Sequence, residues 1–197
     1  MLADFIYLAS ASPRRRELLA QIGVPFRTVS APVEEAVLGG ESADRYVTRL
    51  AAAKADAGWQ ASGPLGARPV LAADTAVVMD GRIFGKPANR EDGTRMLRAL
   101  SARTHCVLTA VALRTTSGTR LKLSASEVSF RPISEAECDA YWDTGEPRDK
   151  AGAYAIQGLA AVYVAELRGS YSGVMGLPLF ETAELLDAAG AARWCKS

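Results

Sequence analysis

The stretch Phe5-Ile-Tyr-Leu-Ala-Ser-Ala-Ser-Pro-Arg-Arg-Arg-Glu-Leu-Leu19 decides how the fold begins. Its first five residues are apolar, with β-branched and aromatic side chains among them, which is typical of a buried strand. Ser12 can cap a helix, and Pro13 suits the first helical position because the amide that proline lacks would have no partner there. The stretch therefore predicts a strand, a tight serine turn and a helix with arginines in its first turn.

Arginines at the start of a helix are unfavourable by themselves. Each exposed cation there opposes the helix dipole by roughly 0.3–1 kcal/mol. An anion bound in the turn removes the conflict, since free amides, the hydroxyls of Ser10 and Ser12, and the guanidinium groups of Arg14 and Arg15 would face it. We expect an anion site in this turn, with a solvated basic helix start as the alternative.

Composition limits the class of protein. With 197 residues, 49% of them hydrophobic and 23% charged, the chain predicts one α/β domain over residues 1–197, within which a smaller lobe could lie at about 89–150. The net charge of +1 argues against a nucleic-acid or membrane surface. The three cysteines have no metal-ligand spacing, and no apolar run approaches the ~20 residues of a membrane span. We expect a cytoplasmic protein.

Apolar strands and amphipathic helices alternate along the rest of the chain. Strands are predicted at about 26–29, 70–73, 76–79, 82–84, 106–115, 121–130 and 160–164, and helices at about 41–60, 89–100, 134–145 and 179–189. Residues 168–178 form a glycine-rich loop in this interpretation. The order predicts an α/β fold with a mixed twisted sheet flanked by helices.

Asp74 is the most informative acid, because it directly follows the apolar run 70–73. That position predicts a carboxylate at the carboxyl end of a strand, where open α/β sheets bind their ligands. The alternative is an aspartate that only caps a helix or forms a turn. Glu34 or Glu35, in the loop before the helix predicted at about 41–60, could supply a second carboxylate for a divalent ion.

Lysines lie in or near several loops that could converge on the same crevice, namely Lys54, Lys86 and Lys150. Together with the serines and arginines of the first turn they would suit phosphate groups, as in phosphoryl-transfer sites. Each lysine alone is more simply a solvated side chain.

Other phosphate and hydrolase motifs are absent from the sequence. It contains no Gly-x-x-x-x-Gly-Lys-Ser/Thr loop, no Gly-x-Gly-x-x-Gly after a strand and no Gly-x-Ser-x-Gly elbow. The one histidine, His105, cannot form a histidine metal cluster, and we expect it to be structural.

Five motifs occur in the order found in Maf proteins, and the sequence resembles that family over nearly its whole length. They are Leu8-Ala-Ser-Ala-Ser-Pro-Arg-Arg-Arg-Glu-Leu-Leu19, Ala73-Asp-Thr75, Gly85-Lys-Pro87, Asp149-Lys-Ala-Gly-Ala-Tyr-Ala-Ile-Gln-Gly158, and Gly169-Ser-Tyr-Ser172 with Gly176-Leu-Pro-Leu179. Maf proteins, also called septum formation inhibitor Maf, are nucleoside triphosphate pyrophosphatases. The fourth motif resembles the subfamily that hydrolyses dTTP and UTP.

The resemblance implies an α/β fold like that of inosine triphosphate pyrophosphatases, with a deep cleft between two lobes. It also implies a divalent metal (Mg²⁺ or Mn²⁺), a homodimer, a nucleoside triphosphate substrate and a cytoplasmic setting. Asp74 matches the family's proton acceptor, and with Glu34 it would hold or flank the metal. Positions linked to substrate choice are Arg14, Thr75 and Gln157, and the polar lining of the cleft matches Ser10, Arg15, Glu34, Lys54 and Lys86.

Gln157 offers a chemical basis for base choice. Uracil and thymine present an N3–H beside carbonyl oxygens, which one carboxamide can match with two hydrogen bonds, whereas cytosine presents an unprotonated N3. UTP and dTTP should therefore be better substrates than CTP, unless Gln157 only binds its own loop. The functional alternative to this enzyme is a nucleotide-sensing regulatory protein that restrains septum formation through a partner.

Overall fold

The computed structural model describes residues 4–63 and 68–191. The strands are β1 (Ile6–Leu8), β2 (Phe26–Thr28), β3 (Val70–Met79), β4 (Arg82–Phe84), β5 (Thr104–Thr115), β6 (Gly118–Phe130) and β7 (Val164–Arg168). The helices are α1 (Pro13–Gln21), α2 (Ala43–Ser62), α3 (Arg90–Leu100), α4 (Glu135–Asp143), α5 (Tyr171–Met175) and α6 (Leu179–Ala188). Short 3₁₀ turns are η1 (Glu146–Asp149), η2 (Ala151–Ala153) and η3 (Leu159–Tyr163).

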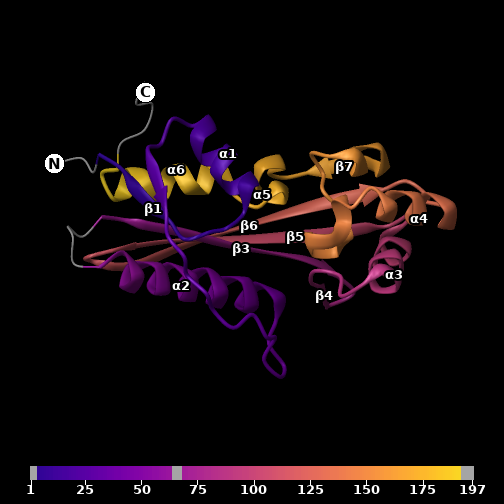
Figure 1. Ribbon diagram of the computed structural model, residues 1–197, viewed down its shortest axis with the longest axis horizontal. Coiled ribbons are helices and arrows are strands. Elements are labelled where there is room, and N and C mark those ends of the chain that lie inside the picture. The colour runs from indigo at the N-terminus through magenta and orange to yellow at the C-terminus, as the bar shows by residue number, and fades with distance from the viewer. Residues whose placement is uncertain (1–3, 64–67, 192–197) are drawn as a thin grey trace.

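The strands form one mixed sheet in the order β2-β1-β3-β5-β6-β7, with β4 paired to β3 as well (Figure 1). β1 runs parallel to both β2 and β3, and the remaining pairs are antiparallel. The long hairpin of β5 and β6 and the strand β3 form its centre. The predicted mixed sheet flanked by helices is confirmed.

Successive residues of β3 face opposite sides of the sheet, and each side is covered by different helices (Figure 1). Val70, Ala72 and Ala76 pack with the inner face of α2. Leu71 and Ala73 pack in a second cluster with side chains of α1 and α6. Asp74, an even-numbered neighbour, therefore faces α2, whereas Thr75 faces α1 and α5.

A third cluster lies where α3 and α4 cover the far ends of β3, β5 and β6. It includes Val77 of β3, Leu97 of α3, Phe130 of β6, Tyr141 of α4 and Tyr163 of η3. Aromatic edges contact one another here, since the rings of Tyr141 and Tyr163 lie 5.6 Å apart at an interplanar angle of 84°.

One edge of β3 is left without a strand at its middle. β1 pairs with β3 only at Val70 and Leu71, and β4 pairs with it only from Val77 onward. On that side residues 73–76 have no neighbouring strand in the described part of the chain, although their other side pairs continuously with β5. Side chains from both faces of the sheet can meet at this gap.

The structure corrects three predictions about local structure. Asp74 does not end a strand, because β3 continues to Met79 and Asp74 pairs with Ala110 of β5. The segment Ala160–Val164 is not a strand: residues up to Tyr163 form the 3₁₀ turn η3, and the strand begins at Val164. Residues 168–178 are not a continuous loop, because Arg168 ends β7 and α5 follows, capped by Ser170, which accepts a hydrogen bond from the Gly173 amide.

The local signals were otherwise reliable. Asn89 caps α3 by accepting a hydrogen bond from the Asp92 amide, and Ser134 and Glu137 form the predicted capping box of α4. None of the helices in the described part of the chain has the length and apolar content needed to span a bilayer. The single domain over residues 1–197, the smaller lobe and the division into two lobes remain predictions.

Candidate active site

A cavity of about 650 Å³ lies at the gap beside β3. Its walls come from the serine turn after β1, the loop after β2, α2, the loop after β4, residues 149–157 and the end of α5. Ten of the residues predicted from the sequence line it, namely Ser10, Ser12, Arg14, Arg15, Lys54, Asp74, Thr75, Lys86, Lys150 and Gln157.

The serine turn presents hydroxyl and amide groups to this cavity. The amide of Ser12 donates to Oγ of Ser10 at 3.2 Å, which holds the turn closed. Ser12 begins α1 in an extended conformation, and its own side chain makes no capping bond to the helix. The Ser12 hydroxyl is therefore free to bind a ligand at the helix N-terminus, where the dipole favours an anion.

Arg15 points inward and makes three hydrogen bonds with the protein. Its Nε donates to the carbonyl of Gly176 at 2.7 Å, and its two terminal nitrogens donate to Thr75 Oγ1 at 3.2 Å and Ser10 Oγ at 3.4 Å. Burial lowers the pKa of Arg15, and the nearby charge of Asp74 partly offsets that effect. Arg15 thus joins α1, β3 and the end of α5, whereas its neighbour Arg14 lines the cavity without such bonds to the described residues and is available to a ligand.

Lys54 of α2 bridges two carboxylates. Its Nζ lies 2.6 Å from Oδ1 of Asp74 and 2.5 Å from Oε1 of Glu35. The side chain of Asp74 is 9% exposed and that of Glu35 is 46% exposed, so the two acids differ in solvation.

This difference separates the two acids chemically. Burial raises the pKa of Asp74, although the charges of Lys54 and Arg15 oppose the rise. Burial also acts to raise the pKa of Glu35, but the hydrogen bond and charge of Lys54 outweigh it, and the net direction is downward. Asp74 is therefore the more basic carboxylate, whereas Glu35 stays ionised; such a split is typical of paired catalytic acids.

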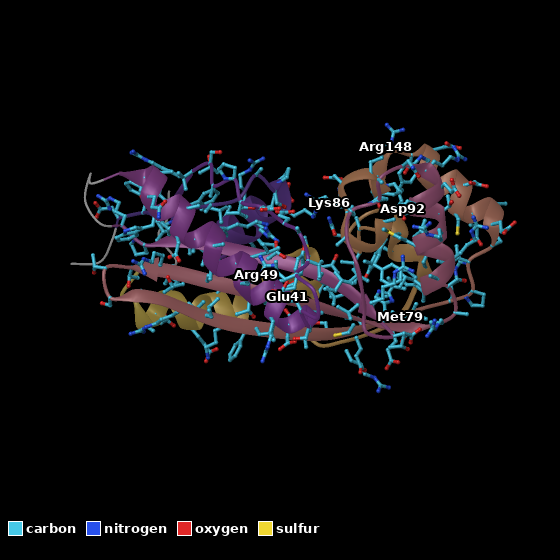
Figure 2. The ribbon with its side chains drawn as sticks, turned by 90° about the horizontal axis from the view of Figure 1, so that it is seen from below. Glu41, Arg49, Met79, Lys86, Asp92 and Arg148 are labelled. Atoms are coloured by element: carbon cyan, nitrogen blue, oxygen red, sulfur yellow. The ribbon has the colours of Figure 1, made fainter. Side chains whose placement is uncertain are left out.

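Glu35 lies in a loop that α2 holds in place. The hydroxyl of Tyr46 donates to the Glu35 carbonyl at 3.1 Å, and Nη2 of Arg49 donates to the Ala36 carbonyl at 3.0 Å. Arg49 also forms two bonds with the carboxylate of Glu41, at 2.6 and 2.7 Å. Figure 2 shows Glu41 and Arg49 close to each other at α2.

Glu34, the predicted partner of Asp74, is exposed and is not among the cavity-lining residues. The structure brings Glu35 there instead, because Lys54 attracts it. The sequence left the choice between the two open, since the contact that decides it spans nineteen positions of the chain. Tyr46 was missed altogether, although it lies two helical turns before Lys54 and so on the same face of α2.

The donor set fits a hard divalent ion that is shared with a substrate. Among residues 4–63 and 68–191, no group of three or more His, Cys, Asp or Glu side chains is arranged to hold a metal. Glu35 and Asp74 do meet at Lys54, and Mg²⁺ commonly uses one or two carboxylates together with substrate phosphates.

Of the remaining predicted residues, Lys86 and Gln157 are exposed and Lys150 is partly buried. Lys86 follows β4 and is exposed, and in Figure 2 it lies between α2 and the segment that carries Arg148. The Nζ of Lys150 contacts the carboxylate of Asp149. Gln157 is exposed in a turn closed by a bond from the Gly158 amide to the Ala155 carbonyl, at 3.0 Å.

Comparison with known proteins gives a consistent result. The family model described as "Maf-like protein" matches residues 5–189. A Saccharophagus degradans protein named dTTP/UTP pyrophosphatase is 54% identical over 190 residues, covering 96% of this chain and 90% of that protein. Proteins of the same name from Chromobacterium violaceum (51% over 187 residues; 94% of each chain) and Methylococcus capsulatus (55% over 185 residues; 94% of this chain and 91% of that protein) are also similar.

Proposed function

Since the chain belongs to the Maf family, we propose that it hydrolyses UTP and dTTP to the nucleoside monophosphate and pyrophosphate. The observation that carries this proposal is the meeting of Asp74, Lys54 and Glu35 beside the basic serine turn in one cavity. The regulatory alternative gains no support from the relatives, which carry the names of enzymes.

The phosphates would bind to the positive side of the cavity. Ser10, Ser12 and the amides at the start of α1 donate hydrogen bonds to phosphate oxygens, and Arg14 supplies charge above them. Lys86 and Lys150, which also line the cavity, would contribute positive charge to the triphosphate. Arg15 contributes indirectly, because its hydrogen bonds hold the side chains of Ser10 and Thr75 in place.

Asp74 acts as the general base. Its carboxylate takes a proton from a water molecule, and the oxygen of that water forms a new bond to the α-phosphorus. The bond from the α-phosphorus to the bridging oxygen breaks, and pyrophosphate leaves with that oxygen. Lys54 holds the carboxylate in position throughout, through the 2.6 Å contact.

We also propose Mg²⁺ or Mn²⁺ as the cofactor, with Asp74 and Glu35 as the protein ligands. Glu35 thus replaces Glu34, which the sequence had suggested beside Asp74. Glu35 suits this role because its lowered pKa keeps it charged. When bound, the ion would neutralise charge on the phosphate oxygens and activate the attacking water.

A cytoplasmic homodimer is part of the proposal. Nucleoside triphosphates are cytoplasmic metabolites, and Cys106 and Cys138 are free thiols, which suits a reducing compartment. The dimer rests on the family resemblance, and light scattering during size-exclusion chromatography measures it directly.

The proposed function is tested by pyrophosphate release from UTP, dTTP and CTP, with Mg²⁺ and with a chelator. We expect UTP and dTTP to be hydrolysed well, CTP poorly, and none with the chelator. Asp74→Asn should lower turnover by about 10²–10⁴-fold, because the amide cannot accept the proton, while UTP still binds. Failure of the wild-type protein to hydrolyse any triphosphate would contradict the function, whereas near-normal turnover by folded Asp74→Asn would contradict only the role of Asp74.

A further inference from the structure

Gln157 lies at the third position of the turn from Ala155 to Gly158, which a backbone hydrogen bond of 3.0 Å closes. Within residues 4–63 and 68–191, no hydrogen bond to protein holds the side-chain amide of Gln157. The backbone of the turn therefore fixes only the position and direction of the Cα–Cβ bond from which the amide reaches a base. What fixes the turn therefore matters for base choice.

The first support comes from α4. The hydroxyl of Tyr141 accepts a hydrogen bond from the Ala155 amide at 3.2 Å and donates one to Oε1 of Glu146 at 2.6 Å. Tyr141 is 3% exposed, and its bond to the Ala155 amide is buried while its bond to Glu146 is partly buried. Burial and the adjacent Glu146 carboxylate raise the pKa of Tyr141, which keeps its hydroxyl protonated as a donor.

The second support holds the other end of the turn. The carboxylate of Glu146 accepts hydrogen bonds from the amides of Leu159 at 3.0 Å and Ala160 at 3.4 Å. It also packs directly on the turn, because a Cβ added at Gly158 would lie 2.2 Å from Oε2 of Glu146. One tyrosine thus holds the backbone two residues before Gln157, and one glutamate holds it two and three residues after.

We propose that Tyr141 and Glu146 are positioning residues for base selection, which hold the Gln157 turn in the geometry that favours uracil and thymine over cytosine. Neither residue lines the cavity, so they act through the turn and do not touch the nucleotide. This inference rests on the proposed function and adds residues that increase the preference for UTP and dTTP over CTP.

A purely structural role for the pair predicts a different pattern. Loss of stability alone would lower the rates with UTP and CTP together, because it reduces the amount of folded enzyme. Loss of positioning instead removes an advantage that only UTP and dTTP have, since a displaced amide leaves the imide edge of the base unpaired. The ratio of specificity constants separates these cases.

The experiment compares kcat/KM for UTP, dTTP and CTP in the wild-type protein and in Tyr141→Phe, Glu146→Gln, Gln157→Ala and Tyr163→Phe. The last variant is a matched control, because Tyr163 is also buried and its hydroxyl bonds to the Glu137 carbonyl, away from the turn. We expect Tyr141→Phe and Glu146→Gln to lower the UTP-to-CTP ratio by about 5- to 10-fold, mainly through a higher KM for UTP. Gln157→Ala should do the same, and Tyr163→Phe should leave the ratio unchanged.

Amide hydrogen exchange over residues 155–160 provides a readout that does not depend on activity. Faster exchange in Tyr141→Phe than in Tyr163→Phe supports the inference, and equal exchange overturns it. An unchanged UTP-to-CTP ratio in both Tyr141→Phe and Glu146→Gln also overturns it, while Gln157→Ala then shows whether base choice by Gln157 itself survives. If the wild-type protein hydrolyses no pyrimidine triphosphate, the proposed function fails, and the positioning role is decided by the exchange result alone.

Discussion

Neighbouring side chains in the first turn of α1 have different tasks, although they are identical in type. Arg15 gives all of its hydrogen bonds to Gly176, Thr75 and Ser10, and so it joins three segments that are far apart in the sequence. Arg14 also lines the cavity, and no hydrogen bond to protein is seen for it in the described part of the chain. Of the two arginines expected to bind phosphate, Arg15 therefore supports the structure of the site and Arg14 is available to bind the ligand.

Replacement of Arg15 should reveal this division. Arg15→Ala leaves the Gly176 carbonyl without its donor, while the hydroxyls of Thr75 and Ser10 keep their bonds from Thr109 and from the Ser12 amide. We expect a loss of about 1–3 kcal/mol in the free energy of unfolding. Arg14→Ala is the matched control, and it should change stability by no more than about 0.5 kcal/mol, with a small gain from relief of the helix dipole. Urea denaturation without nucleotide measures both. An Arg15→Ala protein as stable as the wild type would mean that its hydrogen bonds are offset by the cost of placing a cation at the helix start.

Among the helices, α2 does most to build the site. One of its faces packs on β3 and places Lys54 against Asp74, and its side chains Tyr46 and Arg49 bind carbonyl groups of the loop that carries Glu35. The helix lies very close to the sheet at Gly58, where an added Cβ would be 2.8 Å from Cβ of Ala9. The same helix therefore sets both the position of Lys54 and the position of the loop that carries Glu35.

The grip of α2 on this loop can be tested at Arg49, which lies outside the cavity lining. Arg49→Ala removes the bonds to Glu41 and Ala36, so we expect residues 30–42 to be cleaved severalfold faster by a glutamate-specific protease and kcat/KM for UTP to fall. Arg103→Ala is the matched control, because it removes a similar two-bond contact with Asp80 elsewhere on the surface. Equal cleavage of the two variants would show that the loop holds its position without Arg49.

Local signals in the sequence predicted the elements well, because capping residues and turns act within a few positions. Asp80 and Gly81 both adopt positive φ, as their hairpin turn requires, and the serine turn begins α1 where expected. The position of Asp74 within β3 was not predictable in this way, since it depends on pairing with β5 more than thirty residues later. The segment 160–163 was predicted as a strand, but it forms part of the 3₁₀ turn η3. Its first amide, that of Ala160, donates a hydrogen bond to the Glu146 carboxylate and not to a neighbouring strand.

At the scale of the whole protein, the buried His105 couples folding to pH. His105 is 2% exposed, its Nε2 lies 2.8 Å from the hydroxyl of Tyr154, and its ring contacts the edge of Phe130. Burial lowers the pKa of His105 to about 4 from its ordinary value of 6.5. The imidazole is therefore neutral in the folded protein at neutral pH, as expected for a structural histidine.

The sign of the pH effect follows from this lowered pKa. Between pH 6.5 and about 4 the unfolded chain binds a proton at His105 that the folded protein does not, so stability falls as pH falls through this range and the loss ends near the folded pKa. We expect the contribution of His105 to reach about 3 kcal/mol. The difference in unfolding free energy between the wild type and His105→Gln, measured from pH 7 to 4, isolates it, and the single histidine can be titrated directly by NMR. Parallel curves for the two proteins would rule out this coupling.

The alternation of β3 at the open gap also has a consequence for how such chains can diverge. Asp74 meets Lys54 on one face of the sheet, and Thr75 meets Arg15 on the other, because they are adjacent residues of one strand. Deleting or inserting a single codon between Val70 and Asp74 would exchange the two faces, so that the acid would point at α1 and the hydroxyl at α2. Length variation among descendants of this gene should therefore be confined to the loops, and β3 should tolerate substitutions far better than insertions or deletions.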